Sequence, residues 1–291
     1  METRNQLTPV MRCRSFAEYL DFTGSDLARE CAEADAKLIA DNGAEETWNT
    51  PGFSLLAGQS VDFHVDQLSG GYQSDGKWIP NLRERLVCPI THLNNRQRLV
   101  CTITADRSFA GAQIWFMEQV TPVYVWAAAA LSTCEVNGSE YLGPDATPGE
   151  VRDGLRHEDV ENLSFADSSL DLIVSNEVLE HVPHPSRAFA ECARVLRPGG
   201  RMIMTIPFSF GAPKSVVRAK MAKNGSIRYL LDPVYHGNPI SDKGSLVFTD
   251  YGWDALEMIK DSGFRDAWVD AYHSPRFGHY ADNLFVFEAV R

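Results

Sequence analysis

Polar side chains follow several apolar, strand-like runs in the second half of the sequence. Glu118 comes after the run at 112–117, and Glu140 lies within the run at 136–143. In an open parallel sheet, ligands bind at the carboxyl ends of the strands. An acid there can accept hydrogen bonds from both hydroxyls of a ribose. Glu140 is therefore a candidate nucleoside ligand, and the alternative is a surface acid on a turn.

A second group of candidates offers acid–base chemistry. Residues 209–250 form a long connection, which is typical of lids and binding elements. Within it, Tyr235 and His236 can contact or deprotonate a hydroxyl or an amine, unless they only form a turn. His181 is a third catalytic candidate, although a histidine in such a loop more often orients the backbone by hydrogen bonds.

The elements that must position these residues alternate between strand and helix after Phe109. A continuous Leu-Ile-Val run that ends near Asn176 indicates a strand buried on both faces. This alternation predicts an α/β fold, a mostly parallel sheet covered by helices. We expect seven strands, at 112–117, 136–143, shortly after 155, up to 176, at 201–208, and, as a closing antiparallel pair, at 268–273 and 283–290.

The first part of the chain has a different texture. Residues 14–45 show helical spacing, which predicts an N-terminal arm of two helices. Short β-like pieces follow from Trp48 to Asp106, among them RLVCTIT, and they indicate a small β-rich module. The sequence thus predicts an N-terminal module over 1–108 and a second domain over 109–291.

The net charge of −12 weighs against a nucleic-acid partner, because phosphate binding needs a clustered basic face. The four arginines in 81–98 either form a local basic patch or pair with nearby acids. No apolar run is long enough to span a membrane, and the N-terminus lacks the apolar core of a secretory signal. Six scattered cysteines indicate free thiols. We therefore expect a cytoplasmic protein that does not bind membranes.

Three stretches carry a family resemblance. LSFADSSLDLIVSNEVLEHVPHP, ECARVLRPGGRMIMTIPF and the closing strand pair resemble, in order and spacing, the second half of class I S-adenosylmethionine-dependent methyltransferases. GSEYLG, RHEDVENLSF and YHGNP resemble a bacterial subgroup of methyltransferase-domain proteins. The resemblance implies a Rossmann-like fold and S-adenosylmethionine as cofactor. It implies an adenine site at Asp159 and the Val160 amide, where a turn cap is the alternative for Asp159, and it implies a place for Asn176 near the methyl donor or the acceptor.

Two features depart from that family. The loop after the first predicted strand reads Glu-Gln-Val-Thr-Pro (118–122) and lacks the usual glycines, which let the backbone approach the cofactor closely. The cofactor is then either held differently or not held at all. The residues expected to hold it are Glu118, Gln119, Thr121, Glu140, Tyr141, Asp159, Val160 and Asn176. The subgroup also implies two Cys-x-x-Cys pairs, of which only Cys88 remains, so we expect no zinc and no other metal.

The leading functional hypothesis is methyl transfer to an oxygen or nitrogen of a small molecule or sugar. The first alternative is a methyltransferase-like protein that has lost methyl transfer and catalyses a cyclisation or elimination, since a fold does not fix a function. The second is a non-catalytic partner in a biosynthetic complex. Self-association through the N-terminal arm, for instance as a homodimer, stays open.

Overall fold

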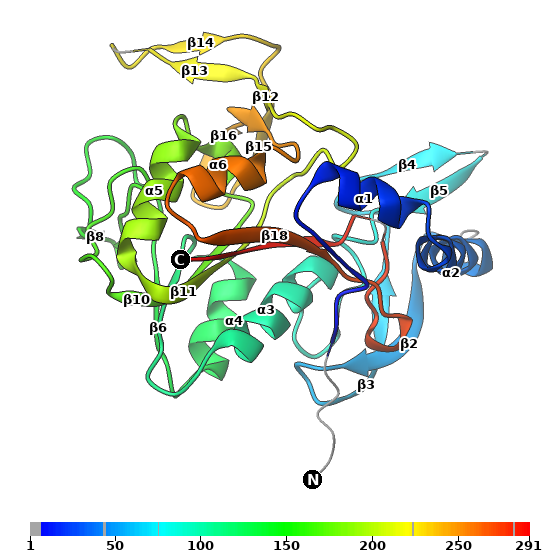
Figure 1. The fold of residues 1–291 in the computed structure, drawn as a ribbon. Coiled ribbons are helices and arrows are strands. Elements are labelled where there is room, and N and C mark those ends of the chain that lie inside the picture. Colours follow the sequence, from blue (N-terminus) through cyan, green and yellow to red (C-terminus); the bar gives the residue numbers. More distant parts are fainter. Residues whose placement is uncertain (1–6, 43–44, 75, 223, 282) are drawn as a thin grey trace. The chain divides into compact units, whose positions relative to one another are not determined.

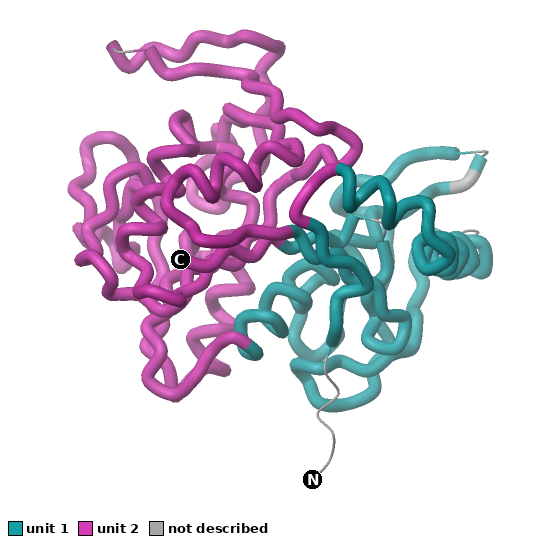
Figure 2. The backbone as a smooth tube through the Cα atoms, viewed as in Figure 1, with its two compact units in different colours: residues 1–13, 17–106, 269–286 teal, residues 14–16, 107–268, 287–291 magenta. Residues whose placement is uncertain are grey.

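A computed structural model describes residues 7–42, 45–74, 76–222, 224–281 and 283–291. Residues 1–6, which belong to the segment examined for a secretory signal, lie outside the described residues. The chain divides into two compact units (Figure 2). Unit 1 comprises 1–13, 17–106 and 269–286, and unit 2 comprises 14–16, 107–268 and 287–291. This division differs from the predicted one in assigning a late segment, 269–286, to the unit formed by the N-terminal part of the chain.

Seven strands form one mixed sheet, as the α/β prediction requires (Figure 1). Their order is β1 (Met11–Cys13), β18 (Asp266–Ala271), β19 (Phe285–Val290), β11 (Leu196–Thr205), β10 (Leu170–Asn176), β6 (Gln113–Phe116) and β7 (Glu135–Gly138). The four strands from β11 to β7 are parallel to one another. β19 is antiparallel to β11, and β1 is antiparallel to β18. The predicted Rossmann-like α/β fold is confirmed.

The central parallel strands β6 and β10 contain continuous apolar runs because both of their faces are buried. In β10, Ile173 and Val174 are fully buried. In the adjacent β6, Ile114 and Phe116 are fully buried as well, and Trp115 is almost so. The Leu-Ile-Val run therefore identified a central strand correctly. Asn176, at the end of β10, lies at the carboxyl edge that these strands share.

The predicted third strand is wrong, since it does not join this sheet. β9 (Leu155–Arg156) pairs only with β8 (Val151–Arg152), as a small hairpin. A single parallel bridge links Glu140 to His157. The two residues of β9 are too few to extend the ladder, and β1 from the N-terminal region supplies the seventh strand instead.

Helices flank the strands of unit 2. α4 (Pro122–Ala130) packs on β7 and α5 (Pro185–Val195) packs on β11. α6 (Ala255–Asp261) packs against α5, and a short 3₁₀ helix, η1 (Leu179–His181), follows β10. Proline at the first position of α4 and of α5 is favourable, because that position has no helical partner for an N–H group.

The connection at 209–250 forms three two-stranded ladders. They are β12 (Val216–Val217) with β17 (Thr249–Asp250), β13 (Ala219–Met221) with β14 (Ile227–Tyr229), and β15 (Tyr235–Asn238) with β16 (Ser241–Leu246). β13 and β14 form the projecting yellow hairpin in Figure 1. The long connection is thus structured, and β15 carries two of the predicted catalytic residues, Tyr235 and His236.

Unit 1 contains the two predicted N-terminal helices, and it corrects one prediction. Its elements are α1 (Phe16–Thr23, whose first residue belongs to unit 2), α2 (Asp26–Asn42), β2 (Trp48–Ser54), β3 (Gln59–Val65), β4 (Gly71–Ser74), β5 (Lys77–Pro80), α3 (Asn95–Arg107) and the 3₁₀ helix η2 (Pro275–Phe277).

The segment RLVCTIT lies in α3 and is helical, not β. The Gln97 amide donates to Asn94 Oδ1 and the Asn94 amide donates to Gln97 Oε1. This reciprocal cap starts the helix and overrides the β-branched residues that follow.

Three of the four arginines of 81–98 pair with acids and the fourth is buried, so the alternative of a free basic patch is wrong. Arg83 and Arg96 both donate to Glu84, and Arg85 pairs with Asp66. Arg98 is buried. All six cysteines are free thiols, as predicted. Within the described residues, no helix has the length and apolarity needed to cross a membrane.

Candidate functional site

The carboxyl ends of β6 and β10 hold a buried acid–amide pair. Glu118, two residues after the end of β6, is 4% exposed. The side-chain amide of Asn176 donates to Glu118 Oε1, and the backbone amide of Asn176 donates to Oε2 at 3.4 Å. Two residues that were predicted from separate strands therefore lie together at one edge of the sheet.

The loop after β6 uses its polar groups to reach the end of β7. The backbone amides of Gln119 and Val120 donate to Glu140 Oε1 at 2.7 and 3.0 Å. The Gln119 side chain donates to Gly154 O and accepts from the Arg156 amide, both at 3.0 Å. These contacts fix the loop in the absence of glycines.

Thr121 caps the helix that follows this loop. Its hydroxyl oxygen accepts from the Tyr124 amide at 3.3 Å, and the proline at 122 starts α4. The Gln119 and Thr121 side chains thus already have partners within the fold. Their role as cofactor ligands stays a prediction.

Glu140 keeps one carboxylate oxygen open. Oε1 receives the two loop amides, while Oε2 accepts no hydrogen bond from the residues that the structure describes. The adjoining Tyr141 is 56% exposed, and its ring lies 5.4 Å from the ring of His157. Buried His157 is fixed in turn, since its Nδ1 accepts from the Leu142 amide at 3.0 Å. Glu140 and Tyr141 therefore place a carboxylate and an exposed aromatic ring side by side in the chain, just after the end of β7.

Asp159 acts as a turn cap in the structure. Its Oδ1 accepts from the Glu161 amide at 2.9 Å, and its carbonyl oxygen accepts from the Asn162 amide at 2.8 Å. Asp159 and Val160 are both partly exposed. The nearby negative charge of Asp159 adds to burial in raising the pKa of the Tyr141 hydroxyl. The adenine role of Asp159 and Val160 stays a prediction.

Two buried side-chain oxygens lie at the end of β10. Within the described part of the chain, neither Asn176 Oδ1 nor Ser175 Oγ has a hydrogen-bond partner. A buried polar atom without a partner costs free energy, so such atoms point to a missing ligand or water. The position of the Asn176 oxygen fits a polar cofactor bound at this edge of the sheet.

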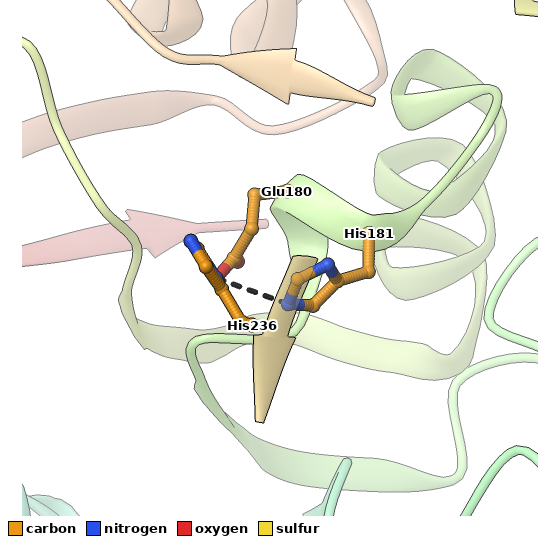
Figure 3. A group of neighbouring side chains, drawn as sticks. All are labelled: Glu180, His181 and His236. Carbon is orange, nitrogen blue, oxygen red and sulfur yellow. Dashed lines mark ion pairs between the residues drawn. The ribbon is translucent and has the colours of Figure 1, made fainter. Parts of the chain in front are cut away.

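A second cluster follows immediately along the chain. Glu180, His181 and His236 bring their side chains together in Figure 3, the first two from η1 and the third from β15. The Nε2 atom of His181 and the Nδ1 atom of His236 each lie 3.4 Å from Glu180 Oε1. The imidazole centroids are 5.0 Å apart. The structure therefore unites two predicted catalytic residues around an acid that the sequence analysis did not select.

The third predicted catalytic residue, Tyr235, lies apart from this cluster. Neighbouring residues of a strand point to opposite faces, and Tyr235 is 52% exposed. Its hydroxyl lies 3.3 Å from that of Tyr229, and this contact raises the pKa of Tyr235. In contrast, the pKa of His236 is raised chiefly by its interaction with the Glu180 carboxylate, which lies 3.4 Å from His236 Nδ1.

Backbone contacts hold the cluster in place. His181 Nδ1 lies 2.9 Å from Leu246 O, and the Phe248 amide donates to Glu180 O at 2.8 Å. The buried Tyr251 hydroxyl donates to Leu179 O at 3.1 Å. Residues 246–251, at the end of the long connection, thus hold η1 in place through hydrogen bonds. One signal for Glu180 is visible in the sequence, its place beside His181 shortly after a buried strand, but its distance to His236 is not.

Comparison with known proteins finds similarity to methyltransferases. Residues 124–204 match the family model of a methyltransferase domain. An uncharacterized methyltransferase from Mycobacterium sp. (strain JLS) is 31% identical over 159 residues, which cover 50% of this chain and 61% of that protein. The central part of the chain is therefore similar to methyltransferase domains.

Two further comparisons also find proteins named as methyltransferases. A malonyl-[acyl-carrier protein] O-methyltransferase from Methylococcus capsulatus is 49% identical over 55 residues, which cover 19% of this chain and 20% of that protein. The crystal structure of an S-adenosylmethionine-dependent methyltransferase from Mesorhizobium loti has a TM-score of 0.42 and 18% identity, and covers 67% of this chain and 98% of that one. The chain spans about 61% of the length of the mycobacterial relative.

Proposed function

We propose that this chain transfers the methyl group of S-adenosylmethionine to an oxygen or nitrogen of a small molecule or sugar. The observation that carries the proposal is Glu140. Its carboxylate is fixed by two loop amides through one oxygen, while the other oxygen remains available at the carboxyl edge of the sheet. This is the position from which an acid can hold the ribose of a nucleoside.

The adenosine half of the cofactor would lie beyond β7 and β9. Glu140 Oε2 would accept from the ribose hydroxyls, and the exposed Tyr141 ring would contact the sugar or base. Asp159 has one carboxylate oxygen in its own turn, and its other oxygen and the Val160 amide would recognise the adenine edge. These assignments use residues whose positions are fixed by the fold.

The methionine half would depend on Glu118 and Asn176. Glu118 is buried and negative, which suits the ammonium group of the methionine moiety. The unpartnered Asn176 Oδ1 would accept a further hydrogen bond there. Gln119 and Thr121 would shape this part of the site through the backbone, because their side chains are engaged in the loop and in the helix cap.

The acceptor would approach from the long connection at 209–250. The adjacent imidazoles of His181 and His236 would bind the hydroxyl or amine of the acceptor or remove its proton. Tyr235 would contact the acceptor from the exposed side of β15. The methylococcal relative is named as an O-methyltransferase, which agrees with an oxygen acceptor.

One observation favours the second candidate, a pocket that has lost methyl transfer and performs another reaction or serves as a biosynthetic partner. Glu140 takes the amides of Gln119 and Val120, and Pro122 has no amide, so the loop offers few donors to a methionine carboxylate. Methyl-labelled S-adenosylmethionine, incubated with the protein and a low-molecular-weight cell extract, separates the two candidates. Label appearing in a small molecule supports methyl transfer, and no transfer by a protein that binds S-adenosylhomocysteine supports the second candidate.

A further inference from the structure

Glu180 is a buried carboxylate without hydrogen-bond donors. Its side chain is 1% exposed. Among the described residues, neither of its oxygens has a hydrogen-bond partner. A buried charge is strongly unfavourable unless it is paired or coordinates a metal. Some positive group must therefore neutralise this carboxylate in the folded protein.

The two histidines are the groups that face it. Because a carbonyl oxygen only accepts, the 2.9 Å contact between His181 Nδ1 and Leu246 O places a proton on Nδ1. In the neutral ring this leaves the lone pair on Nε2, the atom that faces Glu180 Oε1 at 3.4 Å. A lone pair and a carboxylate oxygen repel each other at this distance unless a proton or a cation lies between them.

We propose that Glu180, His181 and His236 bind one divalent transition-metal cation of the Zn²⁺ type. One ligand atom from each side chain lies within 4.8 Å of the other two. Ligands at about 2.0–2.1 Å from a tetrahedral zinc ion are roughly 3.3–3.4 Å apart. The separation of 3.4 Å from Glu180 Oε1 to each imidazole nitrogen agrees with this geometry.

The surroundings of the cluster match those of known metal ligands in kind. Histidines that bind metals usually donate their other ring N–H to a carbonyl or carboxylate, as His181 does to Leu246 O. Two imidazoles and one carboxylate favour zinc and its neighbours over Mg²⁺ and Ca²⁺, which prefer oxygen ligands.

Three protein ligands leave at least one coordination position open, as in catalytic rather than structural zinc sites. Since His236 is 37% exposed, that position can be reached by water or by an oxygen atom of a ligand. The inference goes beyond the proposed methyl transfer and does not depend on it. It also replaces the expectation of no metal, which considered only the cysteine pairs of the N-terminal module.

The test is a calorimetric titration of the metal-free full chain with ZnCl₂. Free thiols also bind zinc, so the measurement is the difference between the wild type and two variants, Glu180→Gln and His236→Gln. The control variant is His184→Gln, which removes a histidine that pairs with Glu161 at 2.7 Å outside the cluster. Thermal unfolding with and without zinc gives a second measurement.

We expect one zinc site in the wild type and in His184→Gln that is at least about tenfold weaker in both cluster variants. Zinc should raise the melting temperature of the wild type and of His184→Gln but not that of His236→Gln. If Glu180→Gln does not fold, the partly exposed His236 still provides the comparison. Equal zinc binding in wild type and His236→Gln, or none in the wild type, would overturn the proposal. Zinc binding without S-adenosylhomocysteine binding would contradict the proposed function alone.

Discussion

His181 and His236 lie edge to face, with ring centroids 5.0 Å apart and ring planes at 85°. His181 comes from the 3₁₀ turn after β10, and His236 comes from a hairpin in the long connection. The hairpin therefore supplies one member of the cluster, His236, while the other two, Glu180 and His181, follow the sheet strand β10. Changes in the hairpin should affect this cluster and leave the edge of the sheet beyond β7 intact.

Gly244 tests how the hairpin positions His236. A Cβ atom at Gly244 would lie 2.6 Å from His236 O, and its φ of 71° disfavours other residues. Gly244→Ala should destabilise the protein by about 1 kcal/mol or more and weaken zinc binding at the cluster, because β15 must shift. Affinity for S-adenosylhomocysteine should stay unchanged, and calorimetry measures both ligands.

Gly237→Ala is the matched control for that substitution. Gly237 lies in the same hairpin, and a Cβ atom there would meet nothing within 4 Å. We expect both affinities to remain at the wild-type level in this variant. Equal losses of zinc affinity in the two variants would contradict the prediction, because they would show that the close approach of residue 244 to His236 O is not the cause.

Glu84 should make the stability of unit 1 depend on pH. Burial alone would raise the pKa of Glu84, but Arg96, Arg83 and Asn94 outweigh it, and the pKa lies below its ordinary value. The folded state therefore binds this proton less readily than the unfolded state. The stabilisation is present above the unfolded pKa and is lost as pH falls through the folded pKa.

Glu84→Gln should lower the free energy of unfolding by about 2 kcal/mol at pH 7, since charged hydrogen bonds are lost. The difference from the wild type should shrink as pH falls below about 4. Urea unfolding across pH 3–7 measures both effects. A difference that stays constant over this range would refute the assigned direction of the pKa.

Arg98 should be essential to the interior of unit 1. Its guanidinium donates to Phe277 O at 2.9 Å and to Gly278 O at 2.6 Å, and it lies 4.0 Å from the ring of Phe63. Burial lowers its pKa to about 9. Arg98→Met should destabilise the protein by roughly 3 kcal/mol or more, because buried carbonyl groups lose their donor. A urea midpoint that stays within error of the wild type would contradict this role.

The sequence predicted the parts of the fold that depend on local pattern. The Leu-Ile-Val run of β10 identified a central strand because burial on both faces leaves no polar alternation. RLVCTIT was misread because the signal for α3 lies outside it, in the reciprocal cap of Asn94 and Gln97. The third strand was misplaced because a two-residue segment has no periodicity to read.

In the candidate site, too, the sequence predicted some residues and missed others. Asn176 was selected from its position after a strand, and its side chain does reach Glu118. Its unpartnered oxygen, however, appears only in three dimensions. Glu180 was missed because its importance comes from burial and from His236, which lies far along the chain. Spacing along the sequence does not reveal such a long-range approach.

The most direct test of the central claim is a calorimetric titration with S-adenosylhomocysteine. We expect the wild type to bind it, and Glu140→Ala to bind it more weakly by roughly 1–3 kcal/mol, the cost of leaving the partners of the carboxylate unpaired. Thermal unfolding of the variant is the control, because Glu140 also holds the loop after β6. Absence of heat from the wild type at millimolar ligand, or equal affinity in a folded Glu140→Ala, would contradict the account.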